Sequence, residues 1–298
     1  MFTKLKREDF KGRSRRLTRE GFAVRPGLWR FAVRAATETQ QRPVWLGRMQ
    51  TRRPETSSGA LWTRASAARP RNDLSVVLVH GVIVSSRYLM PLADELAADF
   101  PVVVPDLPGY GLSEPAPSPP NMADLADAVV AGARAAGHRR LAIVGNSFGA
   151  QIAIAAALRH PDLVERLVLI DLTTDPTARS FPRQFLRWAR CGVDEHLSIL
   201  PVMSRDLVDL GPRQAIHLLR VMMQDRPEQK LPAVRQPTLV VRGGRDRLVS
   251  ASWARQSAEL LPKGRLVVVP GYAHMPHWSG TCVVAPILRD FLAEGESG

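Results

Sequence analysis

The stretch 141–149 reads LAIVGNSFG, and an alanine-rich stretch follows it to Arg159. The apolar run at its start is typical of a strand buried on both faces. Glycines two residues to either side of Ser147 leave room for a tight turn from strand to helix, which would expose the serine hydroxyl at the strand end. The pentapeptide alone also fits an ordinary glycine-containing turn, so the rest of the chain must decide between these interpretations.

Two residues downstream supply the partners that a nucleophilic serine needs. A serine hydroxyl requires a neighbouring base at neutral pH, and the base requires an acid that fixes its tautomer. Asp246 follows an apolar run that ends near Val241, and His274 follows one that ends near Val269. We therefore predict Ser147 as the nucleophile, Asp246 as the acid and His274 as the general base.

Each partner has a competitor. Asp171 also follows an apolar run, but the regular pattern of the chain breaks after it, so Asp246 is favoured. His277 lies three residues further from the strand end than His274 and is interpreted as a helix-entry or pocket residue. The two histidines at helical spacing would suit a metal ion, but no third ligand or HExxH pattern accompanies them. We predict no metal and no cofactor.

Apolar runs alternate with helical stretches along most of the chain, which predicts an α/β fold with an open, doubly wound and mostly parallel sheet. The predicted strands are 75–79, 102–104, 141–144, 167–170, 238–241 and 266–269, and the predicted helices are 87–98, 122–136, 148–159, 251–260 and 283–293. The carboxyl ends of parallel strands share one edge, so the three predicted catalytic residues can converge there. A hairpin is predicted from strands 44–49 and 60–65.

The segment 172–236 interrupts this alternation with helix-like pieces and no convincing strand. We interpret it as a helical cap inserted into a core of residues 42–171 and 237–298. Most of its apolar side chains are expected to form the interior of the cap or to pack on the sheet, and a minority to line an apolar pocket over Ser147. Trp188, Met222 and His277 are the predicted substrate-binding residues.

An oxyanion site is predicted from two segments. His80-Gly81-Val82 follows the strand that ends at Val79, and Phe148 begins the helix after the serine. Backbone N–H groups of Val82 and Phe148 are the predicted donors, the second favoured by the helix dipole. His80 is expected to be structural, and the turn-rich loop 106–113 is assigned no chemistry.

The charge of the chain is concentrated at its beginning. The formal net charge is +13, and residues 1–71 carry 18 Lys and Arg against 5 Asp and Glu, so the remainder is neutral. Residues 1–41 are predicted to form a basic extension, either a solvated arm or helix, or a contact for an anionic surface. Nucleic acid is disfavoured because no binding motif accompanies the charge. The basic start has no apolar stretch of a signal peptide, so we expect a cytoplasmic protein.

These motifs together resemble the α/β-hydrolase superfamily over roughly residues 44–292. The resemblance rests on the residues 80–81, 106–113, 145–149, 243–246 and 273–274. It disfavours haloalkane dehalogenases and epoxide hydrolases, which have aspartate where Ser147 stands. The pair Asn146-Ser147 is similar to that of carbon–carbon bond hydrolases, but Val82-Ile83-Val84 replaces the glycines that these usually carry.

The predicted activity is hydrolysis of a carboxylic ester or thioester of a hydrophobic small molecule through an acyl-enzyme. Two alternatives stay within the fold, namely carbon–carbon bond hydrolysis and acyl transfer to an acceptor other than water. A non-catalytic binding protein is disfavoured, because all three predicted catalytic positions carry chemically competent residues.

Overall fold

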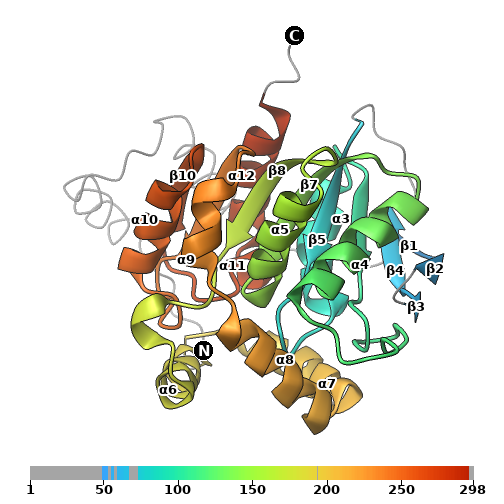
Figure 1. The fold of residues 1–298 in the computed structure, drawn as a ribbon. Helices are drawn as coiled ribbons and strands as arrows, with labels where there is room; N and C mark the ends of the chain where they lie inside the picture. Colours follow the sequence, from blue (N-terminus) through green and yellow to red (C-terminus); the bar gives the residue numbers. More distant parts are fainter. Residues whose placement is uncertain (1–48, 53–54, 57–58, 67–72, 193, 295–298) are drawn as a thin grey trace, which may run out of the picture. The chain divides into compact units, whose positions relative to one another are not determined.

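The structure, a computed structural model, describes residues 49–294 apart from 53–54, 57–58, 67–72 and 193. The predicted extension 1–41 lies outside the described residues. At the centre is an eight-stranded sheet in the order β1-β4-β6-β5-β7-β8-β9-β10 (Figure 1). The strands are β1 (Met49–Arg52), β4 (Thr63–Ser66), β5 (Leu74–Val79), β6 (Val102–Pro105), β7 (Arg140–Asn146), β8 (Val164–Ile170), β9 (Thr238–Gly243) and β10 (Gly264–Val269). Neighbours from β6 to β10 pair in parallel, so the predicted fold class is confirmed.

Helices cover both faces of this sheet. One face packs against α4 (Met122–Ala135), α5 (Phe148–Arg159) and α10 (Ala251–Leu260), and the other against α3 (Met90–Leu96) and α12 (Thr281–Ala293). Alternate residues of β5 point to opposite faces of the sheet. Val77 and Val79 pack in the apolar cluster on the first face, and Val76 and Leu78 pack in the cluster on the second. All six residues of β5 are buried, as a strand between two helical layers requires.

The predicted hairpin is present with shifted bounds. β1 pairs antiparallel with β4, Met49 opposite Ser66, and β4 pairs antiparallel with β6. Between them, β2 (Glu55–Thr56) and β3 (Gly59–Ala60) form a separate antiparallel sheet of two short strands. The described part of the first strand therefore extends from Met49, where the prediction had ended it, to Arg52. Residues 44–48 lie outside the described part.

The segment between β8 and β9 is helical in the described residues. It contains α6 (Phe181–Gly192), α7 (Leu200–Leu210), α8 (Pro212–Gln224) and α9 (Pro227–Lys230), with short 3-10 turns η3 (Pro176–Ala178), η4 (Leu197–Ile199) and η5 (Leu231–Ala233). Figure 1 shows α6, α7 and α8 beyond the lower end of the sheet. We call residues 172–236 the cap from here on.

The apolar side chains of the cap differ from the expectation. Ile199, Leu218, Met222 and Met223 are buried, but many large apolar side chains of the cap are exposed, among them Phe181, Phe185, Leu186, Trp188, Leu197 and Leu200. The expectation that most would be interior was therefore wrong, because helical spacing identifies an apolar face but not what covers it. Within the described residues, no helix is long and apolar enough to span a bilayer.

Candidate active site

Ser147 occupies a strained turn between β7 and α5. Its backbone has φ 58° and ψ −117°, a conformation that residues other than glycine rarely adopt. Backbone strain of this kind costs about 1 to 3 kcal/mol. The flanking glycines are required by close backbone contacts: a Cβ on Gly145 would lie 2.2 Å from the Gly149 oxygen, and one on Gly149 would lie 2.2 Å from the Val79 oxygen. The GNSFG motif thus forms the sharp strand-to-helix turn that presents a serine at the sheet edge.

Asp246 and His274 come together on the loops after β9 and β10. His274 Nδ1 lies 2.8 Å from Asp246 Oδ2, and both residues are buried. The two loops touch where a Cβ on Gly243 would meet the Ala273 oxygen at 1.8 Å. This contact explains the glycine before the acid, because any side chain there would force apart the loops that carry acid and base.

Hydrogen bonds keep Asp246 ionised in spite of its burial. Its Oδ1 accepts the N–H groups of Leu248 at 2.7 Å and Val249 at 3.1 Å. Burial raises the pKa of Asp246, but the charge and hydrogen bond of His274 outweigh it, with smaller contributions from Asp171 and the Val249 N–H, and lower the pKa to about 2. For His274, burial lowers the pKa, but the Asp246 carboxylate raises it more, so the net direction is upward. An ionised acid beside a basic imidazole is the arrangement that general-base catalysis needs.

Asn146 connects the serine turn to the histidine loop. Its Nδ2 donates to the His274 carbonyl at 3.2 Å, and its Oδ1 accepts the Tyr88 hydroxyl at 2.9 Å. The same Tyr88 oxygen accepts the N–H of Gly81 at 2.8 Å. One buried side chain before Ser147 therefore links the turn, the histidine loop and the segment after β5.

The segment after β5 lies against the serine, as the predicted oxyanion site requires. A Cβ on Gly81 would be 3.6 Å from Ser147 Cβ, and the Val82 carbonyl accepts the Tyr110 hydroxyl at 2.8 Å. His80 is structural: its Nε2 accepts the Leu107 N–H at 3.0 Å and its Nδ1 lies 2.9 Å from the Gly81 oxygen. Burial lowers the pKa of His80, in agreement with a neutral ring. The N–H groups of Val82 and Phe148 stay the predicted donors.

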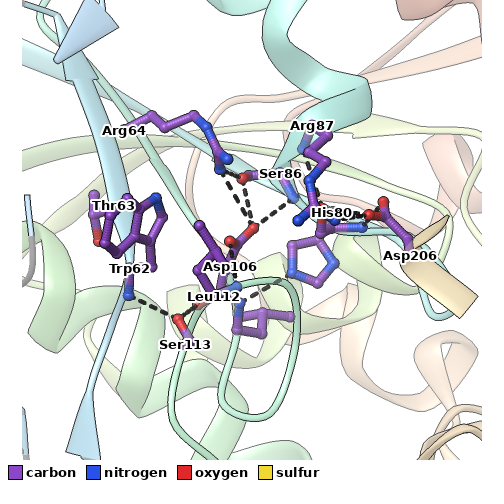
Figure 2. A network of polar contacts seen from close by, with 12 residues as sticks. Trp62, Thr63, Arg64, His80, Ser86, Arg87, Asp106, Leu112, Ser113 and Asp206 are labelled. Carbon is purple, nitrogen blue, oxygen red and sulfur yellow. Dashed lines mark hydrogen bonds and ion pairs between the residues drawn. The ribbon is translucent and has the colours of Figure 1, made fainter. Parts of the chain in front are cut away.

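The loop after β6 supports this segment from the side. Figure 2 shows the buried Asp106 carboxylate at the centre of the contacts: it accepts the N–H of Ser86 at 2.9 Å, the Ser86 hydroxyl at 2.5 Å and the Leu112 N–H at 3.1 Å. Arg64 pairs with the same carboxylate at 3.6 Å. A Cβ on Gly111, at φ +54°, would collide with Asp106 Oδ2 at 2.3 Å. The loop 106–113 therefore has a structural role, in line with the absence of assigned chemistry.

Asp171 lies beside the acid and base, although it was not predicted as a site residue. Potential ligand atoms of Asp171, Asp246 and His274 lie within 4.8 Å of one another. Asp171 is fully buried, and its Oδ1 accepts the Gly243 N–H at 3.0 Å. Burial, followed by the Asp246 charge, raises the pKa of Asp171 well above the usual range. Its position directly after β8 was the only signal in the sequence.

The same cluster raises the question of a metal ion. Two ligands of one tetrahedral zinc ion, each about 2.1 Å from it, lie about 3.4 Å apart. His274 Nδ1 and Asp246 Oδ2 are 2.8 Å apart, the separation of a hydrogen bond. The geometry therefore fits a proton between these atoms better than a metal ion.

The three predicted substrate-binding residues lie in different environments. Trp188 is 45% exposed on α6, with its ring 6.2 Å from that of Phe185. Met222 is buried on α8, and its carbonyl accepts the Thr174 hydroxyl at 3.1 Å. His277 is fully buried in α11 (Pro276–Ser279), edge-on to Tyr88 at 4.8 Å, and burial lowers its pKa to about 3. Their contact with a substrate stays a prediction.

An open cavity of about 470 Å³ borders the acid. It is lined by Asp194, Gly244, Arg245, Asp246 and Arg247. These residues are polar and come from the acid loop and the end of α6, so the cavity differs from the apolar pocket expected over Ser147.

Comparisons with known proteins agree with this geometry. The model of the alpha/beta hydrolase family matches residues 76–286. The chain is 29% identical over 257 residues to a pimeloyl-[acyl-carrier protein] methyl ester esterase of Neisseria meningitidis, covering 78% of this chain and 98% of that protein. It is 29% identical over 238 residues to a 2-hydroxymuconate semialdehyde hydrolase of Pseudomonas sp., covering 71% of this chain and 82% of that protein.

Among solved structures, a thermophilic esterase from Thermogutta terrifontis superposes with a TM-score of 0.66 at 22% identity, covering 83% of this chain and 98% of that one. This likeness concerns the fold. The family model spans most of the chain and includes the serine turn, the acid and the histidine. The chain therefore belongs to the alpha/beta hydrolase family and is a hydrolase of this fold.

Proposed function

We propose that the protein is a serine hydrolase that cleaves a carboxylic ester or thioester of a hydrophobic small molecule through an acyl-enzyme at Ser147. The observation that carries this proposal is the hydrogen-bonded pair Asp246–His274 on loops that Asn146 connects to the strained serine turn. The named relatives support hydrolysis in general, and the ester specificity is our inference from the site.

In the first half of the reaction, His274 Nε2 takes the Ser147 proton while Oγ attacks the carbonyl carbon. The carbonyl π electrons move to oxygen, where the N–H groups of Val82 and Phe148 stabilise the charge. The tetrahedral intermediate then expels the alcohol or thiol, which receives the proton from His274. Asp246 stabilises the imidazolium throughout.

In the second half, a water molecule repeats these steps on the acyl-enzyme. His274 takes a proton from the water, the hydroxyl adds to the ester carbon, and Ser147 leaves with the proton returned by His274. The acid product and the free enzyme result, without any cofactor. Trp188, Met222 and His277 are the side chains that we propose to contact the acyl or leaving group.

Labelling with a fluorophosphonate tests the nucleophile. One equivalent should attach to the wild-type protein and none to Ser147→Ala, because the reagent needs an activated serine. Hydrolysis of p-nitrophenyl esters of increasing chain length then tests the substrate class. Equal labelling of wild type and Ser147→Ala would refute the assignment of Ser147.

Carbon–carbon bond hydrolysis is the second candidate, favoured by the pair Asn146-Ser147 and by the 2-hydroxymuconate semialdehyde hydrolase relative. The hydrogen bonds of Asn146 to Tyr88 and His274 give that residue a structural purpose in any serine hydrolase, which weakens the argument. Product analysis after incubation with a vinylogous 1,5-diketone would reveal this activity. Acyl transfer would appear as a mixed ester product when an alcohol is added to the ester assay.

A further inference from the structure

The cap reaches the histidine loop through one carboxylate. Glu195 lies between α6 and η4, and its Oε1 accepts the backbone N–H of His274 at 2.5 Å and that of Met275 at 3.2 Å. Hydrogen bonds between a carboxylate and N–H groups are among the stronger ones in proteins. The backbone of the predicted base is therefore held by a residue that the sheet core does not supply.

The same end of α6 touches the acid. Cys191, one turn before Glu195, is buried and directs its thiol toward Asp246 Oδ1 at 3.5 Å. The cap segment from Cys191 to Glu195 thus contacts both members of the Asp246–His274 pair. The contacts are specific, since one goes to the acid side chain and the other to the backbone of the base.

A second carboxylate of the cap, which is buried, contacts the segment after β5. Asp206 on α7 accepts the N–H of Ser85 at 2.6 Å and its hydroxyl at 3.0 Å, and it pairs with Arg87 (Figure 2). These residues follow the predicted oxyanion segment. Two carboxylates therefore attach the cap to two separate loops of the proposed site. Glu195 is the carboxylate that contacts the loop of the predicted base, His274.

Four titratable groups surround His274. Burial lowers the pKa of His274, whereas Asp246 and then Glu195 raise it. Asp171 lies within the same cluster, and burial followed by the His274 charge lowers the pKa of His277. Burial raises the pKa of Glu195, opposed by His274 and the two N–H donors. An ionised Glu195 consequently favours protonation of His274.

We propose that Glu195 is a positioning residue of the cap, which holds the backbone of His274 and Met275 so that docking of the cap sets the place of the catalytic base. The inference rests on the proposed role of His274. When the cap is docked, the loop after β10 is fixed from both sides, by Asn146 of the core and by Glu195 of the cap. When the cap moves away, the base loses one of these two supports.

Hydrogen exchange measures this support without any activity assay. In the full-length protein, peptides covering residues 271–279 should exchange about 10-fold faster or more in Glu195→Ala, because the amides of His274 and Met275 lose their acceptor. Glu195→Gln keeps an oxygen acceptor and should retain most of the protection. Unchanged exchange in a folded Glu195→Ala protein would overturn the proposal.

The kinetics of fluorophosphonate labelling supply the second readout. Glu195→Ala should label about 10- to 100-fold more slowly, since a misplaced base is costly. Glu195→Gln removes a negative charge that favours the imidazolium, so the acid limb of its pH profile should move to lower pH. A residue that merely stabilised the cap would not shift this limb. An acid limb that stays in place would refute the electrostatic part of the proposal.

Glu228→Gln is the matched control. Glu228 is a partly buried glutamate of the cap that pairs with Arg179 at 2.6 Å, so the change likewise removes one negative charge and weakens a polar contact of the cap. Its exchange over 271–279 and its pH profile should equal those of the wild type. If the control behaves like Glu195→Gln, a general loosening of the cap explains both. Labelling that survives Ser147→Ala would refute the proposed function, whereas the exchange result would still decide the contact of Glu195.

Discussion

The sheet core and the cap arrange apolar and acidic side chains in opposite ways. Every residue of β5 is buried, and the buried acids Asp171 and Asp246 sit at the carboxyl edge of the sheet. In the cap, Leu197 and Val208 are 74% and 80% exposed. Asp206, by contrast, is only 2% exposed and contacts Ser85 of the core. The core is thus stabilised by apolar burial, whereas the cap combines buried apolar side chains such as Leu218 and Met222 with polar contacts and an exposed apolar surface. Changes at buried positions of the core should therefore have larger effects than matched changes at exposed or polar positions of the cap.

The largest expected effect comes from an acid of the core. Asp246→Asn should lower kcat about 10,000-fold, because an amide favours the wrong histidine tautomer and cannot stabilise imidazolium. The cap variant Asp225→Asn, which loses an ion pair with Lys230, should leave kcat unchanged. Steady-state kinetics on a p-nitrophenyl ester measures both. Equal losses would remove the distinction between the two regions.

A matched pair of leucines tests where stability resides. Leu167→Ala on β8 should lower the free energy of unfolding by about 2 to 5 kcal/mol, because it leaves a cavity in a fully buried cluster. Leu197→Ala in η4 should change it by less than about 0.5 kcal/mol, since the side chain is already exposed. Urea denaturation measures both. A large loss for the cap variant would mean that another surface covers this residue.

Two glycines give a smaller contrast. Gly243→Ala should destabilise the protein by about 1 to 3 kcal/mol and reduce activity, because its Cβ would overlap the Ala273 oxygen next to His274. Gly192→Ala at the end of α6 meets nothing within 4 Å and should cause no loss. Thermal unfolding and ester hydrolysis are the measurements. A tolerated Gly243→Ala would show that the acid and base loops can move apart.

The smallest effect is expected at Asp171, and it depends on pH. In the unfolded chain this carboxyl loses its proton near pH 3.9, whereas its pKa in the folded protein is raised. The stabilisation from protonated Asp171 is therefore complete below about pH 3.9 and is lost as pH rises toward the folded pKa.

Asn cannot ionise, so the free energy of unfolding of Asp171→Asn should fall less over this interval. Its amide can still donate to Asp246, and activity should be largely retained. Urea denaturation at pH 5 and pH 8 is the measurement. A steeper fall with pH in Asp171→Asn than in the wild type would contradict the raised pKa.

The features that could be predicted from the sequence are those that depend on periodic or local residue patterns. All six apolar runs became strands, because continuous burial leaves a pattern that the residues themselves carry. The positions of Asp246 and His274 followed from strand ends, and their 2.8 Å contact fits that reasoning. The strand Met49–Arg52 runs past the end predicted for it at Met49, since its pairing with β4 is set by tertiary contacts and not by local composition.

What could not be predicted depends on contacts between distant segments. Glu195 lies 79 residues from His274 in sequence, and nothing around it distinguishes it from a solvated glutamate. Asp171 was weighed as an alternative acid, but its raised pKa follows from burial and from the neighbouring charge of Asp246, which are visible only in three dimensions. The exposure of Phe185 is a further case, because an amphipathic helix does not reveal whether its apolar side has a partner.

The place of β10 at the edge of the sheet has a consequence for biosynthesis. This strand pairs only with β9 in the described sheet, and the loop that follows it delivers His274. A ribosome therefore releases the serine turn more than a hundred residues before the imidazole. Ser147 is therefore synthesised before its proposed base, and we expect hydrolytic activity to appear only after β10 has paired with β9.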